Sequence, residues 1–178
     1  MSAMHGSNPF ETLGLTPSYA VDRDQVERAY RARIAGAHPD ASPEAMELDP
    51  ASFNQARATL LDDEQRANAL LAMLGGPDAS ACKDLPDGFL MQMMMQRQEI
   101  EEAIESGGDA EREHWEQWGI EQRAEYRQQI TDMFGALGDA PSQDQLRAIR
   151  IQLNAWRYIE RLIEQLDPEY DPAQADFH

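Results

Sequence analysis

His38, Pro39 and Asp40 place an imidazole and a carboxylate on either side of a proline, a combination suited to acid–base chemistry or to recognition by another protein. Proline has a fixed φ and disfavours the helical conformation of the residue before it, so a helix that reaches His38 must end there. A group on an exposed turn lacks the burial that tunes a catalytic pKa. The tripeptide therefore favours recognition, and a surface histidine in an ordinary helix-ending turn is the alternative.

Helical segments are expected on both sides of this turn. Apolar residues recur at three-and-four spacing in residues 22–37 and again in residues 51–61, which indicates an amphipathic helix in each segment. A short helix is expected to begin after the N-cap Asn8 and to end at Gly14. A fourth helix is expected over residues 64–74. The tripeptide would then join two long helices of a small helical domain.

Basic residues gather on the second of these helices, in a chain that is otherwise acidic. The chain has 15 Lys and Arg against 33 Asp and Glu, a net charge of −18. Such a charge repels phosphate, so we expect no nucleic-acid partner and no binding to a membrane surface. Arg28, Arg31 and Arg33 instead indicate docking to an acidic protein partner. Local pairing with Asp24 and Glu27 on a solvated face is the alternative.

The order of these pieces resembles the J-domain, the helical module of DnaJ-type co-chaperones. Residues 9–15 (PFETLGL), Tyr19, the His-Pro-Asp turn and residues 53–60 (FNQARATL) agree with that family in order and spacing. The resemblance implies that the domain docks on the nucleotide-binding region of a DnaK-type chaperone and stimulates its ATP hydrolysis. We assign chaperone binding to Arg28, Arg31, Arg33, His38, Pro39 and Asp40.

Composition changes to Gly, Pro, Asp, Ala and Ser over residues 75–88, which indicates a linker between two domains. Beyond it, three helical segments are separated by breaks at residues 106–108 and 138–141, and short connections imply an antiparallel three-helix bundle. The whole chain is therefore predicted to be all-α. The predicted division is a J-domain at 1–76, a linker at 77–88, the bundle at 89–170 and a flexible tail at 171–178.

The first bundle helix carries two apolar stripes. One stripe, which includes Phe89 and Ile100, is enough to seat the helix. The other stripe lies largely on the opposite side and consists of Leu90, Met91, Met94 and Met95. Methionine is flexible and polarisable, which suits an adaptable binding surface. In the last helix, Tyr158 and Leu162 also lie away from the core stripe, beside Arg157. The alternative is that both stripes are core or pack on the J-domain.

A J-domain, a short linker and an acidic three-helix bundle together resemble the HscB family, the co-chaperones of iron–sulfur cluster assembly. Residues 65–67, 89–91 and 157–158 match segments of that family. The resemblance implies a DnaK/HscA-type chaperone as one partner and the IscU-type cluster scaffold protein as the other, held by the bundle. It assigns the scaffold contacts to Leu90, Met91, Met94, Arg157 and Tyr158.

Four positions depart from the family pattern. Ala41 stands where many J-domains have a basic residue, and Ala37 where family members often have an aromatic. The strength of chaperone docking is therefore left open. Met95 and Gln98 stand where the family tends to have acidic residues, so we expect a more apolar scaffold-binding surface.

Other classes of function lack their motifs. The single cysteine, Cys82, excludes an internal disulfide and a cysteine-built metal site. We find no phosphate-binding glycine loop, nucleophile elbow or His-Glu-x-x-His helix, so we expect no enzyme, no metal and no cofactor. With no apolar stretch of membrane-spanning length and no secretion signal, we expect a cytoplasmic protein, monomeric or weakly dimeric.

Two other functions stay open at this stage. The chain could be a J-domain adaptor for a general DnaK-type chaperone with a different client, its bundle serving for docking or dimerisation. It could also be a structural helical protein whose His-Pro-Asp is accidental, which predicts no ATPase response in any DnaK-type chaperone. The sequence does not distinguish a dedicated chaperone from a general one, or a scaffold with its cluster from one without.

Overall fold

Helices make up all the regular structure in the parts of the chain that the computed structural model describes, residues 8–36 and 50–164. The all-α prediction is thereby confirmed. His38, Pro39 and Asp40 lie outside the described residues, as do Ala37 and Ala41. In chain order the helices are α1 (Pro9–Leu13), α2 (Arg23–Gly36), α3 (Pro50–Leu61), α4 (Asp63–Met73), α5 (Phe89–Gly107), α6 (Asp109–Gly135) and α7 (Gln143–Glu164).

Side-chain caps set where several helices begin. The Asn8 side chain accepts a hydrogen bond of 3.0 Å from the second residue of α1. Before α2, the backbone N–H of Gln25 donates to the Asp22 carboxylate over 2.7 Å, and the Asp22 N–H donates to the Gln25 side chain over 3.1 Å. Ser142 and Gln145 form the same reciprocal pair before α7. Each pair satisfies two N–H groups that a helix start otherwise leaves free.

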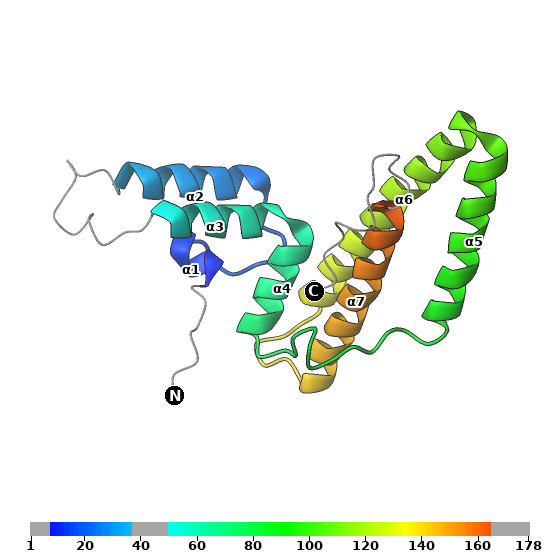
Figure 1. The fold of residues 1–178 in the computed structure, drawn as a ribbon. Helices are drawn as coiled ribbons and strands as arrows, with labels where there is room; N and C mark the ends of the chain where they lie inside the picture. The colour runs from blue at the N-terminus through cyan, green and yellow to red at the C-terminus, as the bar shows by residue number, and fades with distance from the viewer. Residues whose placement is uncertain (1–7, 37–49, 165–178) are drawn as a thin grey trace.

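In the N-terminal half, α2 and α3 lie antiparallel and α1 packs across them (Figure 1). Phe10 and Leu60 are fully buried between these helices. The Tyr30 hydroxyl donates to the Asn54 side chain over 2.7 Å, which ties the two long helices together near their far ends. The C-terminal end of α2 and the N-terminal end of α3 lie at the end of the pair remote from the bundle.

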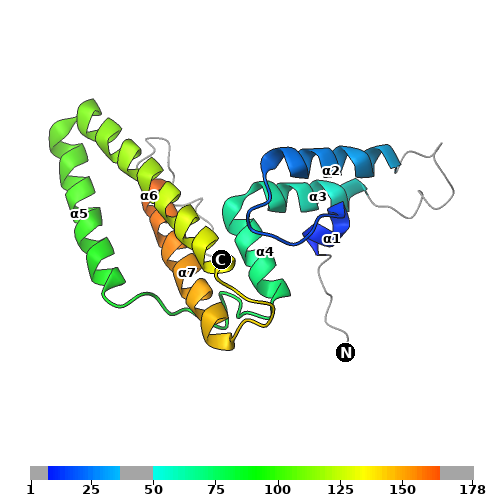
Figure 2. The ribbon, with the colours of Figure 1, turned by 180° about the vertical axis from the view of Figure 1, so that it is seen from behind.

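In the C-terminal half, α6 and α7 lie side by side. The chain reverses direction between α5 and α6 at Gly108 (Figure 2). Gly108 has a φ of 67°, a conformation that favours glycine. Gly119 lets α6 and α7 approach closely, because a Cβ atom there would lie only 3.1 Å from Cγ1 of Ile163. A bundle of three helices results, with α5 as its outer member.

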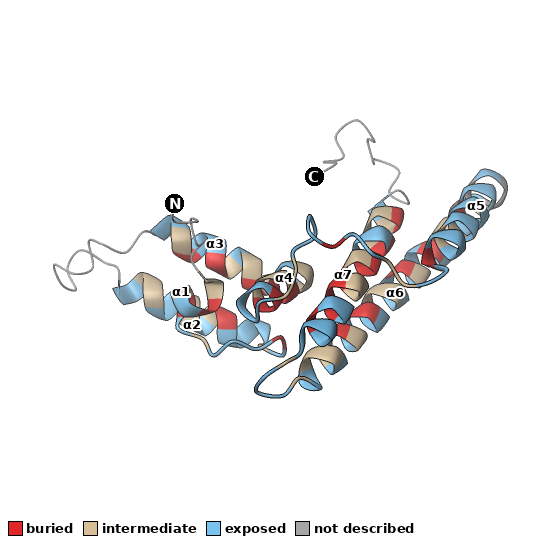
Figure 3. Cartoon of the chain, turned by 90° about the horizontal axis from the view of Figure 1, so that it is seen from below, coloured by how far each residue is buried: buried red, intermediate tan, exposed pale blue. Residues whose placement is uncertain are grey.

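The hydrophobic core crosses from one half to the other. Leu70 and Leu71 of α4 belong to the same buried cluster as Ile149 and Leu153 of α7, and buried residues line the facing sides of these helices (Figure 3). The predicted linker, residues 77–88, contains no helix, since α5 begins at Phe89, and it is held against α7. There the Asn154 amide donates to the carbonyl oxygens of residues 82 and 84 over 2.9 and 3.0 Å. The two halves therefore share one packed junction.

Candidate partner-binding surfaces

The three arginines of α2 do not have equivalent surroundings. Arg31 is exposed, and its Nε donates to the Glu27 carbonyl oxygen of its own helix over 3.2 Å. Arg33 is half-buried against the C-terminal cap of α1, because a Cβ atom on Gly14 would lie 2.5 Å from its Nη2. Arg28 is exposed and borders a shallow hollow beside the α1–α2 connection. Arg31 and Arg33 thus flank the end of α2 that leads into residues 37–49.

The Glu27 carboxylate of α2 forms an ion pair with a residue of α3. Its carboxylate pairs with Arg57 of α3 at 2.6 Å, and the Arg57 guanidinium lies over the Tyr30 ring, 5.2 Å from the ring centroid. The hydrogen bond from Arg57 lowers the pKa of Glu27. Glu27 therefore pairs with a partner on α3, and it does not form an ion pair with an arginine of α2.

The second stripe of α5 faces solvent. The exposed fractions are 51% for Leu90, 71% for Met91, 74% for Met94 and 60% for Met95. Phe89, by contrast, is buried, and its ring meets the Tyr158 ring of α7 edge-on at 6.0 Å. The helix is therefore seated by one face, and the other presents large apolar side chains to any partner. We call these four exposed residues the methionine face.

A groove of about 220 Å³ lies between α5 and α7, next to the methionine face. It brings together Leu90, Met94 and Tyr158, three of the predicted scaffold contacts. Met91 is exposed on α5 but does not line it. The full lining is Leu90, Met93, Met94, Arg97, Tyr158, Arg161 and Leu162.

Leu162 differs from its predicted place, and two arginines of the groove were missed. Leu162 is only 8% exposed and packs in a small cluster with Ile100 and Trp115, so placing it away from the core was wrong. It is buried because α5 covers a second side of α7. Arg97 and Arg161 lie three residues beyond Met94 and Tyr158, a helical spacing that would have found them.

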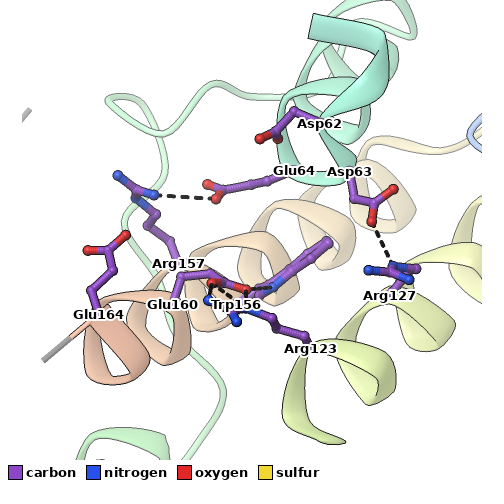
Figure 4. A pocket seen from close by; sticks show the side chains of 9 residues that line it. All are labelled: Asp62, Asp63, Glu64, Arg123, Arg127, Trp156, Arg157, Glu160 and Glu164. Atoms are coloured by element: carbon purple, nitrogen blue, oxygen red, sulfur yellow. Dashed lines mark hydrogen bonds and ion pairs between the residues drawn. The ribbon is translucent and has the colours of Figure 1, made fainter. Parts of the chain in front are cut away.

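Arg157, the remaining predicted scaffold contact, lies on a different side of α7. Its Nη1 is 3.5 Å from the Glu64 carboxylate of α4, in a cleft between the N-terminal half and the bundle (Figure 4). One residue along a helix corresponds to a rotation of about 100°, so Arg157 and its neighbour Tyr158 face different surfaces. The structure does not bring Arg157 into the groove.

The cleft around Arg157 is filled with ion pairs. Arg127 of α6 pairs with Asp63 of α4 at 2.7 Å. Glu160 accepts from both Arg123 at 2.8 Å and the Trp156 indole N–H at 2.9 Å. Burial raises the pKa of Glu64, and Arg157 opposes that shift. Its three arginines, at positions 123, 127 and 157, are paired with carboxylates of the same chain, so the cleft is a junction between the two halves and has no unpaired arginine to offer a ligand.

The described residues contain neither a candidate metal site nor a membrane-spanning helix. Residues 8–36 and 50–164 contain no group of three or more His, Cys, Asp or Glu side chains arranged to hold a metal ion. Within the same ranges, no helix is long and apolar enough to cross a membrane.

Comparison with known proteins identifies a matching family model and a full-length relative. A family model described as the HSCB C-terminal oligomerisation domain matches residues 85–167. The Co-chaperone protein HscB homolog of Shewanella halifaxensis is 32% identical to the chain over 170 residues, which cover 89% of this chain and 94% of that protein.

Solved structures show the same fold. Chaperone HscB from Vibrio cholerae superposes with a TM-score of 0.63 at 24% identity, covering 89% of this chain and 94% of that one. Human co-chaperone protein HscB superposes with a TM-score of 0.68 at 20% identity, covering 93% of this chain and 83% of that one. These likenesses show the fold, a J-domain joined to a C-terminal helical bundle. The 32% identical relative and the family model define the class, which is that of the co-chaperones. Within that class, the chain belongs to the HscB family.

Proposed function

We propose that this co-chaperone stimulates ATP hydrolysis by a DnaK/HscA-type chaperone and delivers the IscU-type iron–sulfur cluster scaffold protein to it. The J-domain would dock through Arg28, Arg31, Arg33 and the turn formed by His38, Pro39 and Asp40. The bundle would hold the scaffold. Binding both partners on one chain raises the effective concentration of the scaffold near the chaperone.

The observation that carries the scaffold half of the proposal is the methionine face. Adjacent large apolar side chains are left in solvent on α5, although the same helix has a separate buried face. Contiguous exposed apolar surface marks an interaction site, and methionine adapts to the shape of a partner. Leu90, Met91, Met94 and Tyr158 form the centre of the proposed contact. Arg157 is proposed to contact the scaffold from the edge, next to its ion pair with Glu64.

The chaperone half rests on the hairpin. Arg31 and Arg33 lie at the end of α2 that leads into residues 37–49, and the Arg57–Glu27 pair holds α2 and α3 in register. An acidic surface on the chaperone's nucleotide-binding region would complement these arginines. ATP would be hydrolysed by the chaperone, with this chain favouring its hydrolysis-competent state.

The test is steady-state ATPase activity of the source organism's DnaK-type chaperones, with this protein and the cluster scaffold added singly and together. We expect the pair to stimulate more than the sum of the two separately. His38→Gln should abolish the stimulation of ATP hydrolysis and leave scaffold binding intact. The double variant Met91→Ala, Met94→Ala should lose only the extra stimulation that the scaffold adds. Stimulation that is indifferent to the scaffold would overturn the delivery function.

A second candidate is an adaptor for a different client whose bundle serves for self-association. The matching family model is described as an oligomerisation domain, and an exposed apolar face also suits a weak dimer. Sedimentation of the chain over a range of concentrations distinguishes the two functions. A dimer that dissociates in the Met91→Ala, Met94→Ala variant, with no scaffold binding by the parent chain, would favour the adaptor.

A further inference from the structure

Arg161 is one of the two arginines that line the groove between α5 and α7. It is half-buried at the rim of the groove between α5 and α7, beside Tyr158 and Leu162. Within residues 8–36 and 50–164, no carboxylate forms an ion pair with it. Arg97 on the opposite rim is paired with Glu101 at 2.8 Å. The groove therefore has an apolar floor and one uncompensated positive charge.

The surroundings make this unpaired charge significant. The chain carries a net charge of −18, and in the cleft on the neighbouring side of α7 the arginines at positions 123, 127 and 157 all pair with carboxylates. Arg161 lies in the last turn of α7, where the helix dipole favours a cation. Glu164, three residues along α7, lines the cleft on the neighbouring side of the helix. Arg161 is therefore open to a carboxylate from outside the described part of the chain.

We propose that the groove receives an apolar side chain of the scaffold protein, and that a scaffold carboxylate beside that side chain pairs with Arg161. This inference rests on the proposed function and specifies the chemistry of its partner. The planar guanidinium can bind a carboxylate through two parallel hydrogen bonds, which adds orientation to the contact. The apolar floor excludes water and strengthens the pair.

Charge complementarity favours the scaffold over a second copy of this chain. Two copies with net charges of −18 repel each other, whereas a scaffold needs only one carboxylate at the contact. The methionine face continues from the groove along α5, so a partner seated there meets both surfaces. The apolar contact would supply most of the affinity, and Arg161 would select the orientation.

The experiment measures binding of the purified scaffold to the full chain by calorimetry at low and high salt. Arg161→Glu should weaken binding about ten-fold or more at low salt, and Arg161→Gln by less. The matched control is Arg112→Glu, which makes the same charge change on α6 away from the groove and should leave binding unchanged. Salt should weaken binding to the parent chain more than binding to Arg161→Gln, because only the parent has the ion pair. Circular dichroism of each variant shows whether the helices are retained.

Reciprocal changes identify the partner carboxylate. Surface Asp and Glu residues of the scaffold are changed to Lys one at a time, and one such variant should restore binding to Arg161→Glu. If Arg161→Glu, with its helices retained, binds like Arg112→Glu while Met94→Ala loses binding, the inference is overturned and the proposed function stands. If the parent chain does not bind the scaffold at all, the proposed function itself fails.

Other occupants of the groove give different results. If the chain's own carboxylates at residues 165–178 occupy it, changing all four to amides will raise affinity for the scaffold, and the inference is overturned. If a second copy occupies it, Arg161→Glu will change the sedimentation of the chain without scaffold, which also overturns it. We expect neither change.

Discussion

The junction between α4 and the bundle and the outer face of α5 are built in opposite ways. At the junction, Leu71 and Ile149 are almost fully buried, and ion pairs such as Arg127–Asp63 close the edges. On α5, Met91 and Met94 are more than two-thirds exposed. The contrast indicates that packing fixes the two halves against each other, whereas the outer helix α5 is held by fewer buried side chains.

This difference suggests that different residues determine the stability of the fold and the binding of a partner. Substitutions at the junction should change the free energy of unfolding, whereas substitutions on the methionine face should change binding. Four predictions test how sharply the two regions divide.

The largest effect is expected for core truncations at the two ends of the bundle. Ile149→Ala removes a side chain from the cluster that spans both halves, so we expect a loss of about 3–5 kcal/mol in the free energy of unfolding. Ile100→Ala, in the small cluster with Trp115 and Leu162, should lose about 2–3 kcal/mol because its surroundings relax more easily. Urea unfolding followed by circular dichroism measures both. Equal losses would contradict the idea that α5 is held more weakly.

The next effect concerns two glycines of α6. Gly119→Ala places a methyl group against Ile163 and should cost about 1–2 kcal/mol, since overpacking outweighs the gain in helix propensity. The control Gly135→Ala meets no atom within 4 Å and should be neutral or stabilising by up to about 1 kcal/mol. The double variant Gly119→Ala, Ile163→Ala should lose less than the sum of its parts. Additive losses would show that the close contact is not what requires glycine.

A smaller effect follows from two carboxylates with opposite pKa shifts. Burial raises the pKa of Glu64 above its ordinary 4.5, with Asp62 and Glu160 adding to the shift and Arg157 and Arg150 opposing it. The stabilising effect of its protonation is present below pH 4.5 and is lost as pH rises through its folded pKa. Glu64→Gln should therefore become more stable relative to the parent as pH rises above 4.5.

Glu27 provides the reverse case. Its hydrogen bond with Arg57 lowers its pKa below 4.5, so its stabilising contribution is present above pH 4.5 and is lost as pH falls through its folded pKa. Glu27→Gln should therefore become less stable relative to the parent as pH rises through this range. Urea unfolding of both variants between about pH 3 and pH 7 measures the two trends. Parallel trends would contradict the assigned shifts.

The smallest effect on folding is expected at the methionine face. Met91→Ala combined with Met94→Ala should change the free energy of unfolding by no more than about 0.5 kcal/mol, because both side chains are already exposed. Scaffold binding should nevertheless be lost. Thermal unfolding and calorimetry on the same preparation measure the two quantities, and a large loss of stability would show that the face is packed in the folded protein.

Local signals predicted the helices and the exposed stripe. Caps such as Asn8 and the Ser142–Gln145 pair depend on residues a few positions apart, so the sequence displays them directly. Periodicity placed Met91 and Met94 on a second face of the helix and left open whether that face was core, and the structure shows that both side chains are exposed.

Long-range contacts could not be predicted in the same way. Leu162 lies off the main stripe of α7 but is buried, because α5 approaches from a second direction. The Arg157–Glu64 pair joins residues far apart in the chain, with no local pattern to reveal it. The family resemblance grouped Arg157 with Tyr158 as scaffold contacts, whereas the rotation of about 100° per residue along the helix turns them to different surfaces.

Gly108 is a candidate hinge at the C-terminal end of α5. It is the single residue between α5 and α6, and its φ of 67° makes the turn without a side chain to brace it. Met91 lies 17 residues before Gly108, about 25 Å away at 1.5 Å per residue. A rotation of about 10° at that pivot would carry Met91 through about 4 Å, by the same geometry. A small change in the backbone angles of this one residue would thus shift the methionine face by several ångströms while the junction stays in place.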